Sequence, residues 1–219
     1  MARSVYSLVL DDDVVREVDR LAYAAGTNRS AMINRILADY CSCTTPEKRM
    51  RLTFDELEKR MDAVNGFRLQ LLPSESMMSI QSALCFKYNP VIRYTVELYR
   101  ENDGLAGELR VGFRTQNRQL IEAFHGFLQV WARMETVYIG RYFANCTVPY
   151  RIENSRYQRP FRAPEREMTS AELGKAIAQY IRMFDAVLKV YFAHIDHPDG
   201  IAYTEDAYRT ALKQMDWII

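Results

Sequence analysis

The stretch Ser4-Val5-Tyr6-Ser7-Leu8-Val9-Leu10, followed by Asp11-Asp12-Asp13, decides how this chain folds. Residues 4–10 have the alternation of a short β-strand, and the three aspartates open an amphipathic helix. Gly26-Thr27-Asn28-Arg29-Ser30 ends that helix and begins a second one, expected to run to about Tyr40. One strand and two helices are too few to bury a core, because a single strand has no hydrogen-bonded neighbour.

The simplest structure that completes this core is a homodimer with two-fold symmetry. The two strands would pair antiparallel, and the four helices would wrap around them. A two-stranded ribbon on a helical base fits the major groove of DNA. The sequence therefore predicts a homodimer, or a higher even oligomer, that binds double-stranded DNA.

The predicted strand has two different faces, because successive side chains point to opposite sides. Tyr6, Leu8 and Leu10 form an apolar face that would lie on the helices, and Val5, Ser7 and Val9 form the outward face. Apolar residues of both helices recur at the helical period and should face inward. They are Val14, Val15, Val18, Leu21, Ala22 and Ala25 in the first helix, and Met32, Ile33, Ile36, Leu37 and Tyr40 in the second.

The turn between the helices has the residues of a helix end and a helix start. Gly26 suits the left-handed residue that ends a helix, and Asn28 is an N-cap candidate. Free main-chain N–H groups near Arg29 and Ser30 would form a phosphate site.

Residues 3 to 42 resemble the ribbon-helix-helix family of DNA-binding proteins, which includes Arc and MetJ. The resemblance lies in Leu10-Asp11-Asp12-Asp13-Val14, similar to the family's strand-to-helix junction, and in the turn at 26–33. It implies that the outward strand face reads base edges. It also implies that the start of the second helix grips the DNA backbone. The expected base contacts are Val5, Ser7 and Val9, and the expected phosphate contacts are Arg3, Asn28, Arg29 and Ser30.

The segment departs from the family in its outward face and its charge. Val5 and Val9 can contact only a thymine methyl or another apolar surface, where the family usually has long polar or basic side chains. Residues 1–43 hold five arginines against six acidic residues, although phosphate neutralisation supplies much of DNA affinity. A ribbon kept only for dimerisation is therefore an alternative.

Other cations could supplement this charge. Lys48, Arg49 and Arg51 follow the first module, and residues 151–166 form an expected irregular loop with five arginines and two glutamates. Such basic and aromatic loops can follow a nucleic acid or an acidic partner. The alternative is a solvated helix face and a loop whose arginines pair locally. The candidates in the loop are Arg156, Arg159 and Arg162.

The rest of the chain has the composition of an ordinary globular domain. Of the 219 residues 48% are hydrophobic and 26% charged, and no apolar run has the length of a membrane span. Four cysteines do not suggest a secreted disulfide framework, which favours the cytoplasm. A polar, proline-containing linker at Ser42–Pro46 divides the chain into a predicted ribbon-helix-helix domain, 1–43, and a second domain, 44–219. The sequence does not assign a role to the second domain, which could serve for oligomerisation or for binding an effector or a protein partner.

We expect an α+β fold for residues 44–219. Residues 76–115 alternate with period two and break at Asn89-Pro90 and at 102–104, which predicts a three-stranded antiparallel meander packed on helices. A helix over 53–65 would have Thr53 and Glu56 as a capping box. The other expected helices span 117–137, 169–194 and 204–216.

No catalytic, metal or cofactor motif stands out, so the chain is not expected to be an enzyme or to need a cofactor. The nearest approach to a metal cluster is His194-Ile195-Asp196-His197-Pro198-Asp199, whose composition equally suits a helix end. The leading functional hypothesis is a transcriptional repressor on a palindromic operator. The alternatives are an accessory protein of plasmid partition or conjugative transfer, and a protein-interaction or inhibitor module.

Overall fold

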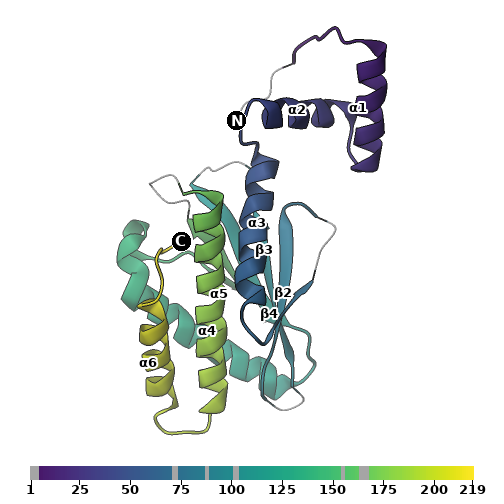
Figure 1. Ribbon diagram of the computed structural model, residues 1–219. Coiled ribbons are helices and arrows are strands. Elements are labelled where there is room, and N and C mark those ends of the chain that lie inside the picture. The colour runs from purple at the N-terminus through teal and green to yellow at the C-terminus, as the bar shows by residue number, and fades with distance from the viewer. Residues whose placement is uncertain (1–4, 71–73, 87–88, 101–103, 154–155, 163–167) are drawn as a thin grey trace. The chain divides into compact units, whose positions relative to one another are not determined.

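The computed structural model describes residues 5–70, 74–86, 89–100, 104–153, 156–162 and 168–219. The chain divides into two compact units, Met1–Arg49 and Met50–Ile219 (Figure 1). We refer to them as unit 1 and unit 2 and describe each by itself. In the part of the chain that the structure describes, no helix combines the length and the apolar composition needed to cross a membrane.

Two helices lie entirely within the described residues of unit 1, α1 (Asp12–Ala24) and α2 (Arg29–Tyr40). Asp12 and Asp13 lie in the first turn of α1, where negative charge complements the helix dipole. The helices share a small apolar core of Val18, Ala22 and Met32. The predicted helix pair and its glycine turn are thus present in the single chain.

The predicted N-terminal strand does not form in the single chain. Residues 5–10 have neither helical nor strand hydrogen bonding, and the first regular element is α1. The physical reason is that a β-strand is defined by its ladder partner, and the partner expected here would belong to a second copy. Ser4 lies outside the described residues.

Unit 2 is built on a six-stranded antiparallel sheet with the order β1-β2-β3-β4-β6-β5. The prediction of a three-stranded meander is correct for its centre and wrong in extent, because one strand adds to one edge and two add to the other. The strands are β1 (Phe67–Gln70), β2 (Met77–Ala83), β3 (Val91–Leu98), β4 (Leu105–Phe113), β5 (Arg151–Glu153) and β6 (Arg156–Arg162).

Four long helices complete the fold, which is α+β as expected. They are α3 (Pro46–Asp62), α4 (Arg118–Ile139), α5 (Ser170–Ala193) and α6 (Gly200–Leu212), and the 3-10 turns η1 (Gly140–Tyr142) and η2 (Ala144–Cys146) follow α4. The expected start of α3 is wrong: the helix begins at Pro46, since proline suits a first helical position, and Thr53 is buried within it.

Helices α3 to α6 and one face of the sheet share one apolar core. Aromatic rings join the layers at its centre. Trp131 of α4 lies 4.6 Å from Phe184 of α5, and Phe184 lies 6.0 Å from Tyr94 of β3, measured between ring centroids. The alternation of the meander therefore identified the buried face, with Ile80, Tyr94 and Val111 all buried.

The expected irregular loop at 151–166 is instead a strand pair over its described residues. Strand β6 alternates, so that Tyr157, Arg159 and Phe161 face the core and are fully buried. Arg159 Nε lies 3.0 Å from Glu135 Oε1 of α4. Pro160 is tolerated because β5 pairs only with residues 156–158, which leaves this part of β6 without a ladder on that side.

Glu135 is also the acceptor of two buried phenols. Tyr157 donates to Oε2 at 2.6 Å and Tyr180 donates to Oε1 at 2.8 Å. Burial, and then the charge of Glu135, raise the pKa of both tyrosines well above 10, so both remain donors. A glutamate in the apolar stripe of α4 is thereby satisfied on both oxygens.

Candidate nucleic-acid interface

The start of α2 is a capped helix end that follows a glycine turn, as the sequence predicts. Gly26 has a φ of +61°, and the Asn28 side chain accepts a hydrogen bond from Ala31 N at 2.9 Å. Met32 N donates to the main-chain oxygen of Asn28. The first N–H groups of a helix have no acceptor within it, and the N–H groups of Arg29 and Ser30 lie at this position in α2.

Arg29 is engaged within the chain. Its Nε and Nη2 donate to the two carboxylate oxygens of Asp19 at 2.7 and 2.5 Å. The hydrogen bond to Arg29 lowers the pKa of Asp19. Both side chains are about half exposed, and exposed ion pairs contribute little, so a phosphate could compete for this guanidinium.

Other cations of unit 1 are neutralised in the same way. Arg16 pairs with Asp13, Arg20 pairs with Glu17, and Lys48 Nζ lies 2.8 Å from Asp39 of α2. The structure therefore does not relieve the shortage of positive charge that the sequence indicates. Arg3 lies outside the described residues.

The predicted reading face is fully open. Val5 and Val9 are 100% and 102% exposed, and Ser7 is exposed as well. Within the described residues of one chain, these outward side chains are therefore accessible to a partner molecule.

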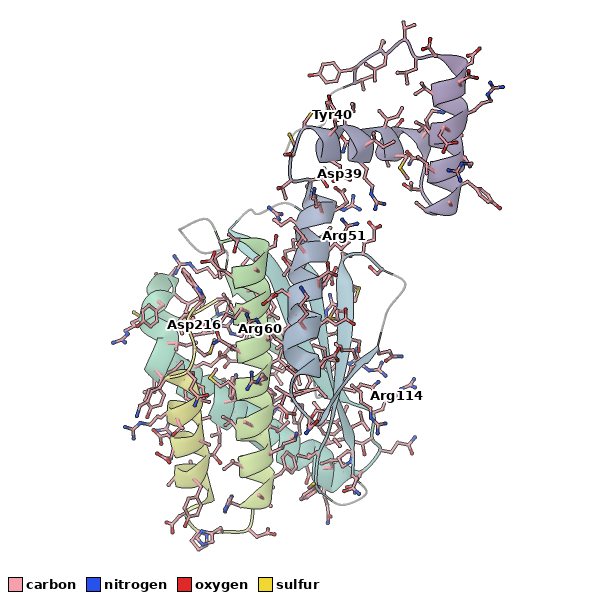
Figure 2. All side chains as sticks on the ribbon, viewed as in Figure 1. Asp39, Tyr40, Arg51, Arg60, Arg114 and Asp216 are labelled. Atoms are coloured by element: carbon pink, nitrogen blue, oxygen red, sulfur yellow. The ribbon has the colours of Figure 1, made fainter. Side chains whose placement is uncertain are left out.

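The apolar face predicted to point inward is largely uncovered. Only Val18, Ala22 and Met32 of the expected core are buried. Tyr40, at the end of α2 in Figure 2, is 89% exposed. The uncovered apolar side chains are Tyr6, Leu8, Leu10, Val14, Ile36, Leu37 and Tyr40.

The cations that were expected to supplement the charge of the first module differ in how accessible they are. Arg51 and Arg156 are exposed, whereas Arg49 is half-buried. Arg162 donates to the main-chain oxygen of Tyr142. The prediction that Arg159 contacts a nucleic acid is wrong, because this side chain is fully buried against Glu135.

The sequence contains a signal for the buried pair of Arg159 with Glu135. Arg159 shares the alternation of Tyr157 and Phe161, and Glu135 lies four residues after Trp131 on the apolar stripe of α4. The sequence analysis also missed the ion pair of Lys189 with Asp185 at 2.6 Å, in which Asp185 is buried and Lys189 is partly exposed. Lys189 donates to Ser82, and Asp185 accepts from Tyr94.

The histidine cluster shows local contacts. His194 Nδ1 lies 2.9 Å from the main-chain oxygen of Val190, and the rings of His194 and His197 pack against Tyr203. Among the described residues no group of three or more histidine, cysteine or acidic side chains is arranged to hold a metal ion.

Comparison of the chain with family models, with curated proteins and with solved structures found no match.

Proposed function

We propose that this chain is a DNA-binding protein that acts as a two-fold dimer, with a ribbon-helix-helix module in its first 43 residues. The observation that carries the proposal is the uncovered apolar face of unit 1. Leu8, Leu10 and Leu37 are 60%, 40% and 50% exposed, although the alternation and the helical period predict all three as core residues. A second copy covers them if the two strands pair and the helices interlock.

Burial of this face is the driving force for the dimer. Removing apolar surface from water contributes about 25 cal/mol per Å², or about 1.5–3 kcal/mol for each large side chain that becomes fully buried. Seven large apolar side chains in each copy are exposed and available for such burial. Pairing of residues 4–10 with the same residues of the partner also gives the strand its missing ladder.

In this dimer the outward side chains of the ribbon enter the major groove and the starts of the two α2 helices hold phosphates. The Asn28 cap and the N–H groups of Arg29 and Ser30 support the phosphate contact. The acid-paired arginines imply an affinity that depends on releasing Arg29 from Asp19. A repressor that occupies a palindromic operator is the most specific form of this proposal, because a two-fold protein matches a two-fold site.

The second candidate is a protein whose ribbon serves only for dimerisation and does not bind DNA, which we call a clamp. The observation that favours it is the apolar character of Val5 and Val9 together with the pairing of Arg16, Arg20 and Arg29 with acids. In that case the ribbon serves only to join two copies, and the partner of the protein binds unit 2.

Fluorescence anisotropy with random-sequence and genome-derived duplexes at two salt concentrations tests the proposal. The variant is Arg29→Ala. Its matched control is Arg118→Ala, because Arg118 also follows a capping asparagine, opens a helix and pairs with an exposed acid, Glu122. We expect binding that weakens with salt and falls about tenfold in Arg29→Ala, since charge-assisted hydrogen bonds are lost, but not in Arg118→Ala. A dimer that binds no duplex at low salt contradicts the proposal and favours the clamp.

A further inference from the structure

The sheet of unit 2 has two faces with different surroundings. Helices α3 to α6 pack on the face that carries Ile80, Tyr94 and Val111, and Figure 1 shows α3 and α5 in front of the strands. The alternate side chains of each strand point to the opposite side, which we call the outer face. Val91 and Arg93 of β3 lie on the outer face and are exposed.

Three arginines lie in one row across the outer face, and we call them the arginine row. The row runs through Arg68 of β1, Gln81 of β2, Arg93 of β3, Gly112 of β4 and Arg156 of β6. Its last step follows from the pair of Val111 with Tyr157, which precedes it in the register. Neighbouring strands are about 4.8 Å apart, so the row extends about 19 Å across the sheet.

The charge of the arginine row is not compensated within the chain. Arg68, Arg93 and Arg156 are all exposed, and among the described residues none of them has an ion-pair or hydrogen-bond partner. Glu153 is the cross-strand neighbour of Arg156, but its Oε1 lies 3.6 Å from Nε of Arg151 instead. The row therefore differs from the arginines of unit 1 that pair with acids.

The other acids of the outer face are occupied away from the row. Arg110 forms ion pairs with Glu97 at 2.6 Å and with Glu108. Gln158 and Tyr99 also donate to Oε2 of Glu108, at 2.7 and 3.0 Å. These acids therefore do not compete for the guanidinium groups of the arginine row.

The composition of the row favours a phosphate backbone as its partner. The positions between the arginines are Gln81 and Gly112, so a protein partner would find no apolar anchor there. They also supply no aromatic ring on which the bases of a single strand could stack. A second copy would place arginine against arginine. Guanidinium groups bind phosphate oxygens with paired hydrogen bonds, and an extended row suits a repeating polyanion.

We propose that the outer face of unit 2 is a second DNA contact surface, on which the arginine row neutralises phosphates of a double helix without reading its sequence. This inference rests on the proposed function, because it names the source of the positive charge that unit 1 lacks. Each phosphate contact made by the row releases counter-ions and steepens the salt dependence of binding by about 0.9.

The double variant Arg68→Gln with Arg93→Gln tests the proposal in anisotropy titrations of the full chain with a random-sequence duplex. We expect its affinity to fall at least about tenfold at low salt and its salt slope to fall by about 1.8, because two phosphate contacts are lost. Arg68→Lys with Arg93→Lys keeps both charges and should keep the slope.

The matched control is Arg133→Gln with Arg182→Gln. These arginines lie on α4 and α5, are exposed, and have no ion-pair partner among the described residues. The control removes the same charge from the helical layer and should bind DNA like the wild type. Equal losses in the two glutamine variants would overturn the proposal, because net charge alone would then explain them.

The same titrations separate this surface from the contact of unit 1. Binding that is lost in Arg29→Ala and unchanged in Arg68→Gln with Arg93→Gln would overturn the outer face and leave the proposed function intact. The reverse result would support the outer face and contradict the contact at the start of α2. A wild type that binds no duplex would overturn both.

Two further probes test the chemistry of the partner. Unlabelled duplex should displace the labelled duplex at lower concentration than poly-glutamate or a single-stranded oligonucleotide of the same length. Poly-glutamate that competes as well as duplex would overturn the phosphate partner in favour of an acidic polypeptide. A single strand that competes as well would overturn the double helix as the partner.

Discussion

Arg159 of β6 and Glu135 of α4 form an ion pair in which neither side chain is exposed, with 3.0 Å between Nε and Oε1. The pair joins the sheet to the helical layer at the centre of the core. Removing either side chain would leave the other charge buried without its counter-ion.

Glu135→Ala should therefore destabilise unit 2 by about 3–5 kcal/mol, because it leaves a buried guanidinium without its counter-ion. Replacing both charges, as in Glu135→Leu with Arg159→Met, should cost less than Glu135→Ala alone. Urea denaturation followed by circular dichroism measures both. A double variant no more stable than Glu135→Ala would contradict the coupling of this pair.

These residues also show where prediction from sequence succeeded and failed. Helix α4 could be predicted because Asn117 caps it and its apolar residues recur at the helical period. Strand β6 was missed because its arginines resemble a solvated loop. Burial of Arg159 depends on Glu135, which lies 24 residues earlier and is brought there only by the fold.

Unit 1 illustrates a different limit. The helices and the Asn28 cap follow from local sequence and are present. A strand cannot be judged from one copy when its expected ladder partner is a second copy, so residues 4–10 remain a prediction. Strand β1 was missed because an alternation of only four residues, Phe67–Gln70, is too short to be distinguished from a loop.

Tyr99 gives unit 2 a dependence on alkaline pH. Partial burial, and then its 3.0 Å hydrogen bond to Glu108, raise the pKa of Tyr99 to about 12. The unfolded chain releases this proton near pH 10, so the stabilisation is complete below about pH 10 and is lost as the pH rises to about 12. The difference in unfolding free energy between wild type and Tyr99→Phe should shrink over this range. Denaturant titrations at several pH values check this, and a constant difference would contradict it.

Gly174 permits the close approach of α5 to α3. A Cβ at this position would lie 2.6 Å from the main-chain oxygen of Thr53, so Gly174→Ala should cost about 1–3 kcal/mol. Gly126→Ala is the matched control, because its Cβ would meet only the movable hydroxyl of Tyr191. Thermal denaturation should show a lower midpoint for Gly174→Ala alone. Equal midpoints for the two variants would contradict the packing described here.

The substitution Val9→Lys distinguishes a ribbon that contacts DNA from one that serves only for dimerisation. If the outward face enters the groove, a lysine there should raise affinity for random duplex DNA and steepen the salt dependence by about 0.9 for each added phosphate contact. Val137→Lys adds the same charge at an exposed position of α4 and should change neither. Identical behaviour of the two variants in anisotropy titrations would indicate that the ribbon does not face DNA.

The dimer is the claim on which the DNA-binding proposal rests, and sedimentation equilibrium of the full chain tests it directly. Wild type should have twice the 25.6 kDa mass of one chain. Leu37→Lys, which places a charge in the predicted interface, should be monomeric at the same concentration. Val137→Lys, at an exposed position of α4, should remain dimeric. A monomeric wild type, or a Leu37→Lys variant as dimeric as Val137→Lys, would contradict the account.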